Sequence, residues 1–165
     1  MKTFRITIAA PVAVLAALVL VAGTAVAGTT VKKLPFTANY TGNATTKVTN
    51  NIAAISATGT GTGTFVGKST ITGLGSGDTS QQPCVPFTGT GLIKGTGTTK
   101  LSFKVTPGSS SCGDEKGESF AISGHATVIK GTGKLAKAKG ILKMTGTYDH
   151  TSGAFSVKFF GTLTA

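Results

Sequence analysis

The sequence predicts an all-β protein: a single antiparallel β-barrel of about eight strands that follows a cleaved signal peptide. Three observations support this fold class. Apolar and polar residues alternate with period two along the last third of the chain, which is typical of half-buried antiparallel strands. Turn and loop segments that contain glycine separate the predicted strands. No helical periodicity follows the signal peptide. Eight strands suffice to close a small barrel without exposed sheet edges.

The first 27 residues have the three parts of a secretory signal peptide. Lys2 and Arg5 form a basic start, residues 6–21 are almost wholly apolar, and Ala25-Val26-Ala27 is a cleavage motif. Cleavage would leave a barrel domain of residues 28–165 without a transmembrane span. The predicted location is therefore secreted, either extracellular or periplasmic. Retention of the segment as a membrane anchor is the alternative.

The strands before the last third are delimited by turn signals. In residues 58–64 threonine alternates with glycine, so an extended chain would carry threonines on one face and glycines on the other. A glycine face allows a backbone or an aromatic ring to approach closely. The predicted strands contain or span residues 36–40, 52–65, 68–74, 85–94 and 98–106, with loops at 75–83 and 107–116.

Three further strands fill Ser119 to Ala165, joined by a glycine-bounded turn at 131–140 and a hairpin at 149–153. Because it is rich in lysine and glycine, we expect the 131–140 turn to add little to the core. The alternation predicts that ten side chains point into the barrel: Phe120, Ile122, Val128, Leu142, Met144, Tyr148, Phe155, Val157, Phe159 and Leu163.

The 131–140 turn carries a family resemblance. Gly131-Thr132-Gly133, followed by Ala138 and Gly140, resembles a glycine-rich signature of the allene oxide cyclase and dirigent-type barrels. The chain departs from that signature at Lys130, where glycine is usual, and at Leu135, where an aromatic residue is usual. The resemblance covers about residues 118–165. The hairpin that follows, Gly146-Thr147-Tyr148-Asp149 to Ser152-Gly153-Ala154-Phe155, is similar to that of small secreted bacterial members of the superfamily. No catalytic or coupling residue of the family aligns with this chain.

Cys84 and Cys112 are the two cysteines of the chain. In an exported protein such a pair predicts one disulfide, because the compartment is oxidising. The bridge would tie the two predicted loops together. A thiol nucleophile is the less favoured interpretation, since it would need one of only two histidines as a nearby base.

The sequence contains none of the common catalytic, nucleotide-binding or zinc motifs, so we predict no catalytic residue, metal ligand or cofactor. Three of the five acids, Asp114, Glu115 and Glu118, fall in or beside a polar loop and are interpreted as solvated. Asp149 and His150 occupy a hairpin turn, where Asp is expected for structural reasons. By the alternation, His125 faces solvent.

Removal of Lys2 and Arg5 would reduce the 16 cations to 14, all lysine, against five acids, a net charge of +9. Lysine suits diffuse attraction to polyanions better than specific reading of nucleic acid. A simple solubilising role is the alternative. The candidate ligand-binding residues are five lysines that no acid interrupts and that a barrel would gather at one end: Lys130, Lys134, Lys137, Lys139 and Lys143.

These observations predict a secreted, non-enzymatic protein that binds a small apolar ligand or an anionic polymer of the cell envelope. The first alternative, which the family resemblance implies, is an isomerase or cyclase acting inside the barrel. Such an enzyme would need a buried polar group aimed at its substrate. The second alternative is a structural extracellular protein.

Overall fold

The structure, a computed structural model, describes residues 31–165, which form one compact unit. The predicted signal peptide lies outside the described residues. The unit contains nine strands and one short 3₁₀ helix: β1 Lys33–Thr49, β2 Ile52–Gly63, β3 Gly67–Asp78, β4 Cys84–Lys94, β5 Lys100–Val105, β6 Ser110–Gly113, β7 Ser119–Thr132, η1 Gly133–Leu135, β8 Ile141–Asp149 and β9 Ala154–Thr164.

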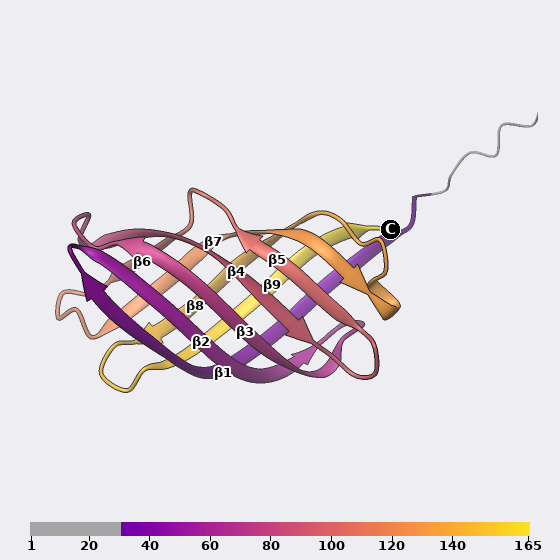
Figure 1. Cartoon of the computed structure of the whole chain (residues 1–165), viewed down its shortest axis with the longest axis horizontal. Helices are drawn as coiled ribbons and strands as arrows, with labels where there is room; N and C mark the ends of the chain where they lie inside the picture. Colours follow the sequence, from indigo (N-terminus) through magenta and orange to yellow (C-terminus); the bar gives the residue numbers. More distant parts are fainter. Residues whose placement is uncertain (1–30) are drawn as a thin grey trace, which may run out of the picture. The chain divides into compact units, whose positions relative to one another are not determined.

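The strands form a closed antiparallel barrel, as the sequence predicts (Figure 1). The order around the wall is β3-β2-β1-β9-β8-β7-β5-β4, and the pairing of β3 with β4 closes it. Eight strands therefore make the wall, and β6 is one extra strand. Closure pairs both edges of the long strands over most of their length, whereas the end of β1 extends past β9 and pairs with β2 alone.

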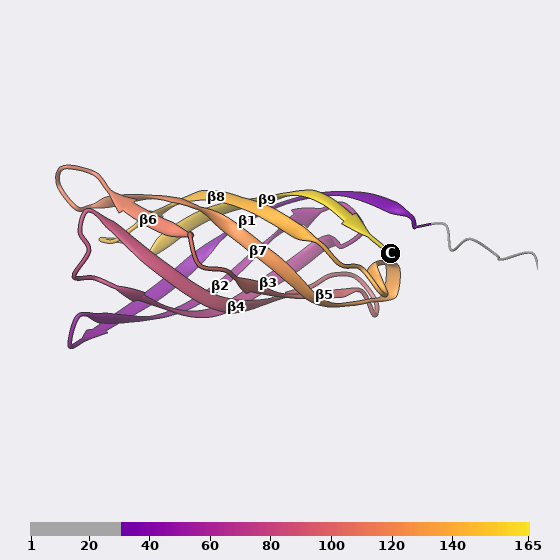
Figure 2. The ribbon, with the colours of Figure 1, turned by 90° about the horizontal axis from the view of Figure 1, so that it is seen from above.

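The sequence prediction treats residues 107–116 as a loop, but part of this segment forms strand β6. It pairs with β4 and β7 beyond the point where β5 ends, so β5 and β6 successively occupy one position in the wall (Figure 2). Ser109, which is almost fully buried, holds the break between them. Its hydroxyl donates to the Thr106 carbonyl at 2.9 Å and accepts from the His125 amide at 3.1 Å. The predicted loop at 75–83 is also too long, because β3 continues to Asp78.

Cys84 and Cys112 form the predicted disulfide. They lie directly opposite each other in the β4–β6 ladder, so the bridge joins two strands rather than two free loops. It fixes the extra strand to the barrel wall. A disulfide at this position indicates an oxidising, extracytoplasmic environment.

The predicted orientation of the C-terminal strands is confirmed. Six of the ten side chains expected inside are fully buried, and the other four are half-buried and face the interior of the barrel. His125 is exposed, as expected. The glycine face of β2 also behaves as predicted: a Cβ atom on Gly61 would lie 2.7 Å from the Tyr40 ring, and one on Gly59 would lie 2.9 Å from the Phe155 ring.

One end of the barrel is filled by side chains. It is the end where β1 begins and β9 ends, and its core includes Leu34, Val66, Leu101 and Leu163. The 131–140 turn folds over it, and Leu135 is completely buried. The expectation that this turn adds little to the core is therefore wrong. The 3₁₀ turn directs the Leu135 side chain into the barrel, while the lysines of the turn are exposed to solvent. We call this end of the barrel the closed end.

Tyr40 carries the buried phenol of the core. Its hydroxyl lies 2.9 Å from the Ser69 hydroxyl, which also donates to the Gly67 carbonyl. Burial raises the pKa of Tyr40, and the hydrogen bond to Ser69 opposes that rise only in part. At pH values between the ordinary pKa of tyrosine and this raised pKa, Tyr40 therefore keeps its phenol proton in the folded state, whereas the unfolded chain has lost it.

We expect the free energy of unfolding to decrease above pH 10, the ordinary pKa of tyrosine, more steeply in the wild type than in Tyr40→Phe. The raised pKa contributes stability below the unfolded-state value, and this contribution is lost as the pH rises. Denaturant titrations at about pH 8 and about pH 11 measure the difference. Parallel decreases in the two proteins would show that Tyr40 ionisation is not coupled to unfolding. Lysine titration is common to both.

Candidate functional site

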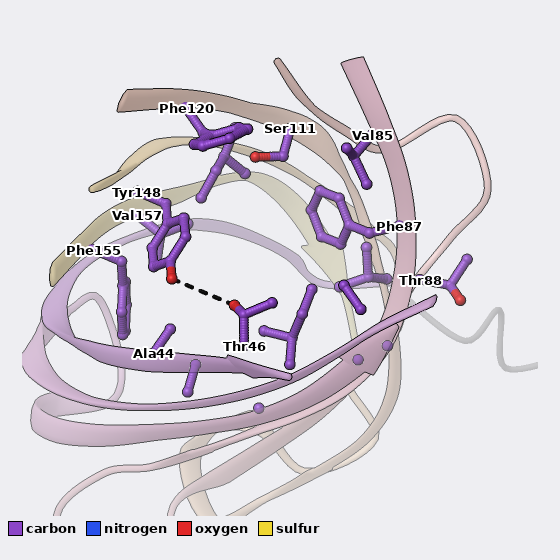
Figure 3. A pocket seen from close by; sticks show the side chains of 18 of the residues that line it. Ala44, Thr46, Val85, Phe87, Thr88, Ser111, Phe120, Tyr148, Phe155 and Val157 are labelled. Atoms are coloured by element: carbon purple, nitrogen blue, oxygen red, sulfur yellow. Dashed lines mark hydrogen bonds between the residues drawn. The ribbon is translucent and has the colours of Figure 1, made fainter. Parts of the chain in front are cut away.

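A cavity of about 590 Å³ opens at the end of the barrel opposite the closed end (Figure 3). We call this the open end. It is surrounded by the β1–β2, β3–β4 and β8–β9 connections and by β6. The volume lies within the range of about 300–1,000 Å³ that is usual for small-molecule sites.

One wall of the cavity is aromatic. Phe120 on β7, Tyr148 on β8 and Phe155 on β9 project from three neighbouring strands toward the centre (Figure 3). The register explains the grouping, because Phe120 pairs with Tyr148 and Tyr148 pairs with Phe155. Three adjacent rings present a continuous apolar surface, suitable for contact with an apolar or aromatic molecule.

The facing wall combines backbone exposed at glycines with apolar side chains, which include Val85 and Phe87 on β4 (Figure 3). Gly73 and Gly75 on β3 and Gly89 on β4 line the cavity, and no side chain projects from these positions. Gly73 is distinctive, because a Cβ atom there would meet only the Thr90 carbonyl oxygen, at an ordinary 3.7 Å. On Gly89 it would collide with the backbone of β3. Gly73 therefore leaves space that a side chain could occupy.

The floor separates the cavity from the filled part of the barrel. Phe103, Met144, Val157 and Phe159 line it from below and belong to the core at the same time. The Phe159 ring packs against Phe103, with centroids 5.1 Å apart. The depth of the cavity is therefore set by core packing.

Polar groups in the cavity are few and lie toward its mouth. The Tyr148 hydroxyl and the Thr46 hydroxyl are 3.4 Å apart (Figure 3). His150 lies beside the aromatic wall, with its ring centroid 6.2 Å from that of Tyr148 and 6.3 Å from that of Phe120. Among residues 31–165, no acid and no lysine lines the cavity. The hydroxyl pair can thus exchange hydrogen bonds with one polar group of a mostly apolar molecule.

The candidate lysines lie elsewhere. Lys130, Lys134, Lys137, Lys139 and Lys143 are all exposed and occupy the end of β7, the 131–140 turn and the start of β8. The structure gathers them at the closed end, as the sequence implies, but none lines the cavity. The apolar and the cationic surfaces are therefore at opposite ends of the barrel.

The five acids all lie at the open end. Asp78 ends β3, Asp149 ends β8, and Asp114, Glu115 and Glu118 lie between β6 and β7. Hydrogen bonds from Ser80 lower the pKa of Asp78, and hydrogen bonds from Ser152 lower that of Asp149. Asp149 accepts from the Ser152 amide at 2.7 Å, the structural role expected for Asp in a turn. The acidic side chains are therefore confined to the open end of the barrel.

Sequence reasoning did not find the cavity. Phe120, Tyr148 and Phe155 are predicted to point inward, but the lining residues of β1 to β4 are not singled out. The only available signal is the period-two glycine pattern in β3 and β4, with Gly73 and Gly75 facing Gly91 and Gly89. That pattern predicts space or close approach and cannot by itself distinguish the two.

Comparison of the chain with known proteins does not assign it to a family. No protein-family model, curated protein or solved structure gives a significant match to it. Within the described residues, no helix is long and apolar enough to cross a membrane. The same part of the chain contains no group of three or more His, Cys, Asp or Glu side chains that could hold a metal ion.

Proposed function

We propose that the protein is a secreted, non-enzymatic carrier that binds a small, mostly apolar molecule inside the open end of the barrel. The observation that supports this most directly is the cavity itself. It has an aromatic wall, a facing wall with glycine positions and a floor of core side chains, and its few polar groups lie near the mouth. A ligand would place its apolar body against the rings and a single hydrogen-bonding group near Tyr148 and Thr46.

Kinship with the allene oxide cyclase and dirigent-type barrels belongs to the same proposal. It is supported by the barrel topology and by the glycine-rich turn at residues 131–140. An isomerase or cyclase is the alternative function. It would have to work with Tyr148 and His150, the two ionisable side chains that line the cavity among residues 31–165. A carrier needs neither group to transfer a proton, which makes binding the simpler proposal.

Native mass spectrometry of the protein isolated from its producing organism tests for a retained ligand. We expect an additional mass that is lost when the protein is denatured. A chain of bare mass that also binds no apolar probe would contradict the carrier proposal and favour a structural extracellular role. Conversion of a ligand into an isomer of equal mass would favour the enzyme.

A substitution at Gly73 tests the location of the site. Gly73→Leu should place a side chain in the cavity without a backbone clash. We expect it to weaken binding of a fluorescent anilinonaphthalene probe by at least about tenfold, because the probe must share a fixed volume with the leucine. The melting temperature should stay equal or rise, since leucine suits a strand better than glycine.

The matched control is Thr72→Leu, one residue earlier, where the side chain is exposed on the outer face of β3. It adds similar apolar surface without entering the cavity, so probe binding should remain at the wild-type level. Equal probe affinity in the two variants would show that the probe binds outside the barrel.

A further inference from the structure

We propose that the outer wall of β7, β8 and β9 near the closed end, together with the lysines of that end, binds the surface of an anionic lipid bilayer. This surface is separate from the cavity, and the inference does not depend on the proposed carrier function. It is defined by three apolar side chains, Ile129, Ile141 and Phe160, and by the lysines around them, and we call it the basic wall.

The apolar centre of the basic wall results from strand register. Ile129 is 61% exposed and Ile141 is 60% exposed. Ile141 pairs with Thr127, two residues before Ile129 on the same strand, so the two isoleucines are diagonal neighbours on the outer face. A register shift between β5 and β7 at this point leaves Ile129 without a partner on β5 and turns both Ile129 and Lys130 outward.

Lysines frame this apolar centre. Lys130 follows Ile129, while Lys139 and Lys143 flank Ile141 at a distance of two residues on either side. Lys143 pairs across the ladder with Phe160, and the Lys158 ammonium lies 5.7 Å from the centroid of the Phe160 ring. All four lysines are exposed. The arrangement combines apolar side chains that can enter an interface with cations that can meet anionic headgroups.

The surrounding charges strengthen the same pattern. Further lysines lie at the adjoining closed end, where β1, β3 and β5 begin, where β4 ends, and in the turn after β7: Lys32, Lys33, Lys68, Lys94, Lys100, Lys134 and Lys137. All five acids lie at the open end. Approach to an anionic surface therefore meets no repulsion from side-chain carboxylates at this end.

A bilayer fits the basic wall better than two other partners. A soluble polyanion would be held by the lysines alone, and the exposed isoleucines would add nothing to its binding. A second copy of the chain would bring one set of lysines against another, which is unfavourable. An anionic bilayer uses both kinds of side chain at once.

Vesicle co-sedimentation tests the proposal. The purified chain, with its N-terminus defined by intact mass, is mixed with phosphatidylcholine vesicles that contain or lack phosphatidylglycerol. We expect binding only to the anionic vesicles, and we expect it to weaken as salt is raised from about 0.1 M to about 1 M. Equal binding to both vesicle types would overturn the proposal.

Two double variants with the same change in charge locate the surface. Lys139→Gln with Lys143→Gln should weaken vesicle binding about twenty-five-fold, from roughly fivefold per lysine. The control combines Lys47→Gln with Lys116→Gln, because both of these lysines lie at the open end. The control should weaken binding far less. Equal losses would mean that only net charge matters and would overturn the assignment.

A double variant separates a bilayer from a soluble polyanion. Ile129→Ser with Ile141→Ser keeps every charge and should weaken vesicle binding by about tenfold, because the apolar contact is lost. Binding to inorganic polyphosphate should be unchanged by it. Wild-type vesicle binding by this variant, with full competition by polyphosphate, would replace the bilayer with a soluble polyanion as the partner. Melting temperature and probe binding in the cavity should be unchanged in all three variants.

Discussion

Replacing Phe159 with alanine is expected to lower the free energy of unfolding by about 3–5 kcal/mol. Phe159 is only 2% exposed and lies between the filled part of the barrel and the cavity. Its ring makes an edge contact with Tyr40 at 6.3 Å and a tilted contact with Phe103 at 5.1 Å. Truncation would leave a void beneath the cavity and remove both contacts. Denaturant unfolding measures the loss.

The neighbouring Phe160→Ala is the matched control. Phe160 points to the outer face of β9, is half-buried, and carries the Lys158 ammonium over its ring. Its removal should cost about 1 kcal/mol or less, because no closed void forms. A loss as large as that of Phe159→Ala would show that the outer face of β9 is covered by something else. Because Phe160 belongs to the basic wall, the same variant should weaken vesicle binding.

Removing the disulfide with Cys84→Ser and Cys112→Ser is expected to lower stability by about 3–4 kcal/mol in the chain-entropy model. The bridge closes a loop with a sequence separation of 28 and fixes a four-residue strand to the wall. Apart from its backbone pairing with β4 and β7, strand β6 has little packing to hold it, because its side chains are only partly buried. Thermal unfolding of oxidised protein and of the double variant measures the difference.

A reductant control separates the bridge from the serine side chains. Reduction of the wild type should increase its intact mass by two hydrogen atoms and lower its melting temperature to that of the double variant. The reduced chain should also lose affinity for the cavity probe, since Ser111 of β6 lines the cavity. No mass change on reduction would contradict the disulfide.

The C-terminal third of the fold could be predicted in detail because two independent sequence signals agree there. Each strand there carries large apolar residues at alternate positions, and the two joints carry turn residues. A register slip of one residue would turn all of these side chains to the wrong face. Phe120, Leu142 and Phe159 therefore point as expected, and the pairing of Tyr148 with Phe155 follows from the short hairpin.

Strand β6 and the end of β3 could not be predicted because their sequences lack alternating large apolar residues. Ser110, Ser111 and Gly113 read as loop residues, and the strand exists because β4 and β7 on either side provide hydrogen-bonding edges where β5 has ended. Likewise, Gly75 to Asp78 extend β3 because β2 and β4 hold both of its edges. Tertiary pairing here overrides local preference.

Of the two candidate binding surfaces, the lysines could be predicted from the sequence and the cavity could not. The lysines are recognisable because side chains define them, and their placement at one end follows from a single turn. The cavity depends on side chains that are missing, at Gly73 and Gly75, and on the meeting of strands far apart in the chain. A glycine in a strand can accommodate a ring, as Gly91 accommodates Phe103, or leave a space, as Gly73 does. Only the three-dimensional structure distinguishes these cases.

The glycines that line the cavity have a consequence for how the ligand specificity of such a barrel can change in evolution. In most binding sites a change of ligand requires one lining side chain to be exchanged for another, with a risk to packing behind it. At Gly73 the change would be an addition into the cavity, and the added Cβ atom would meet its nearest neighbour at an ordinary distance. Descendants of this sequence could therefore narrow the cavity for a smaller ligand through a single codon change that leaves the core intact.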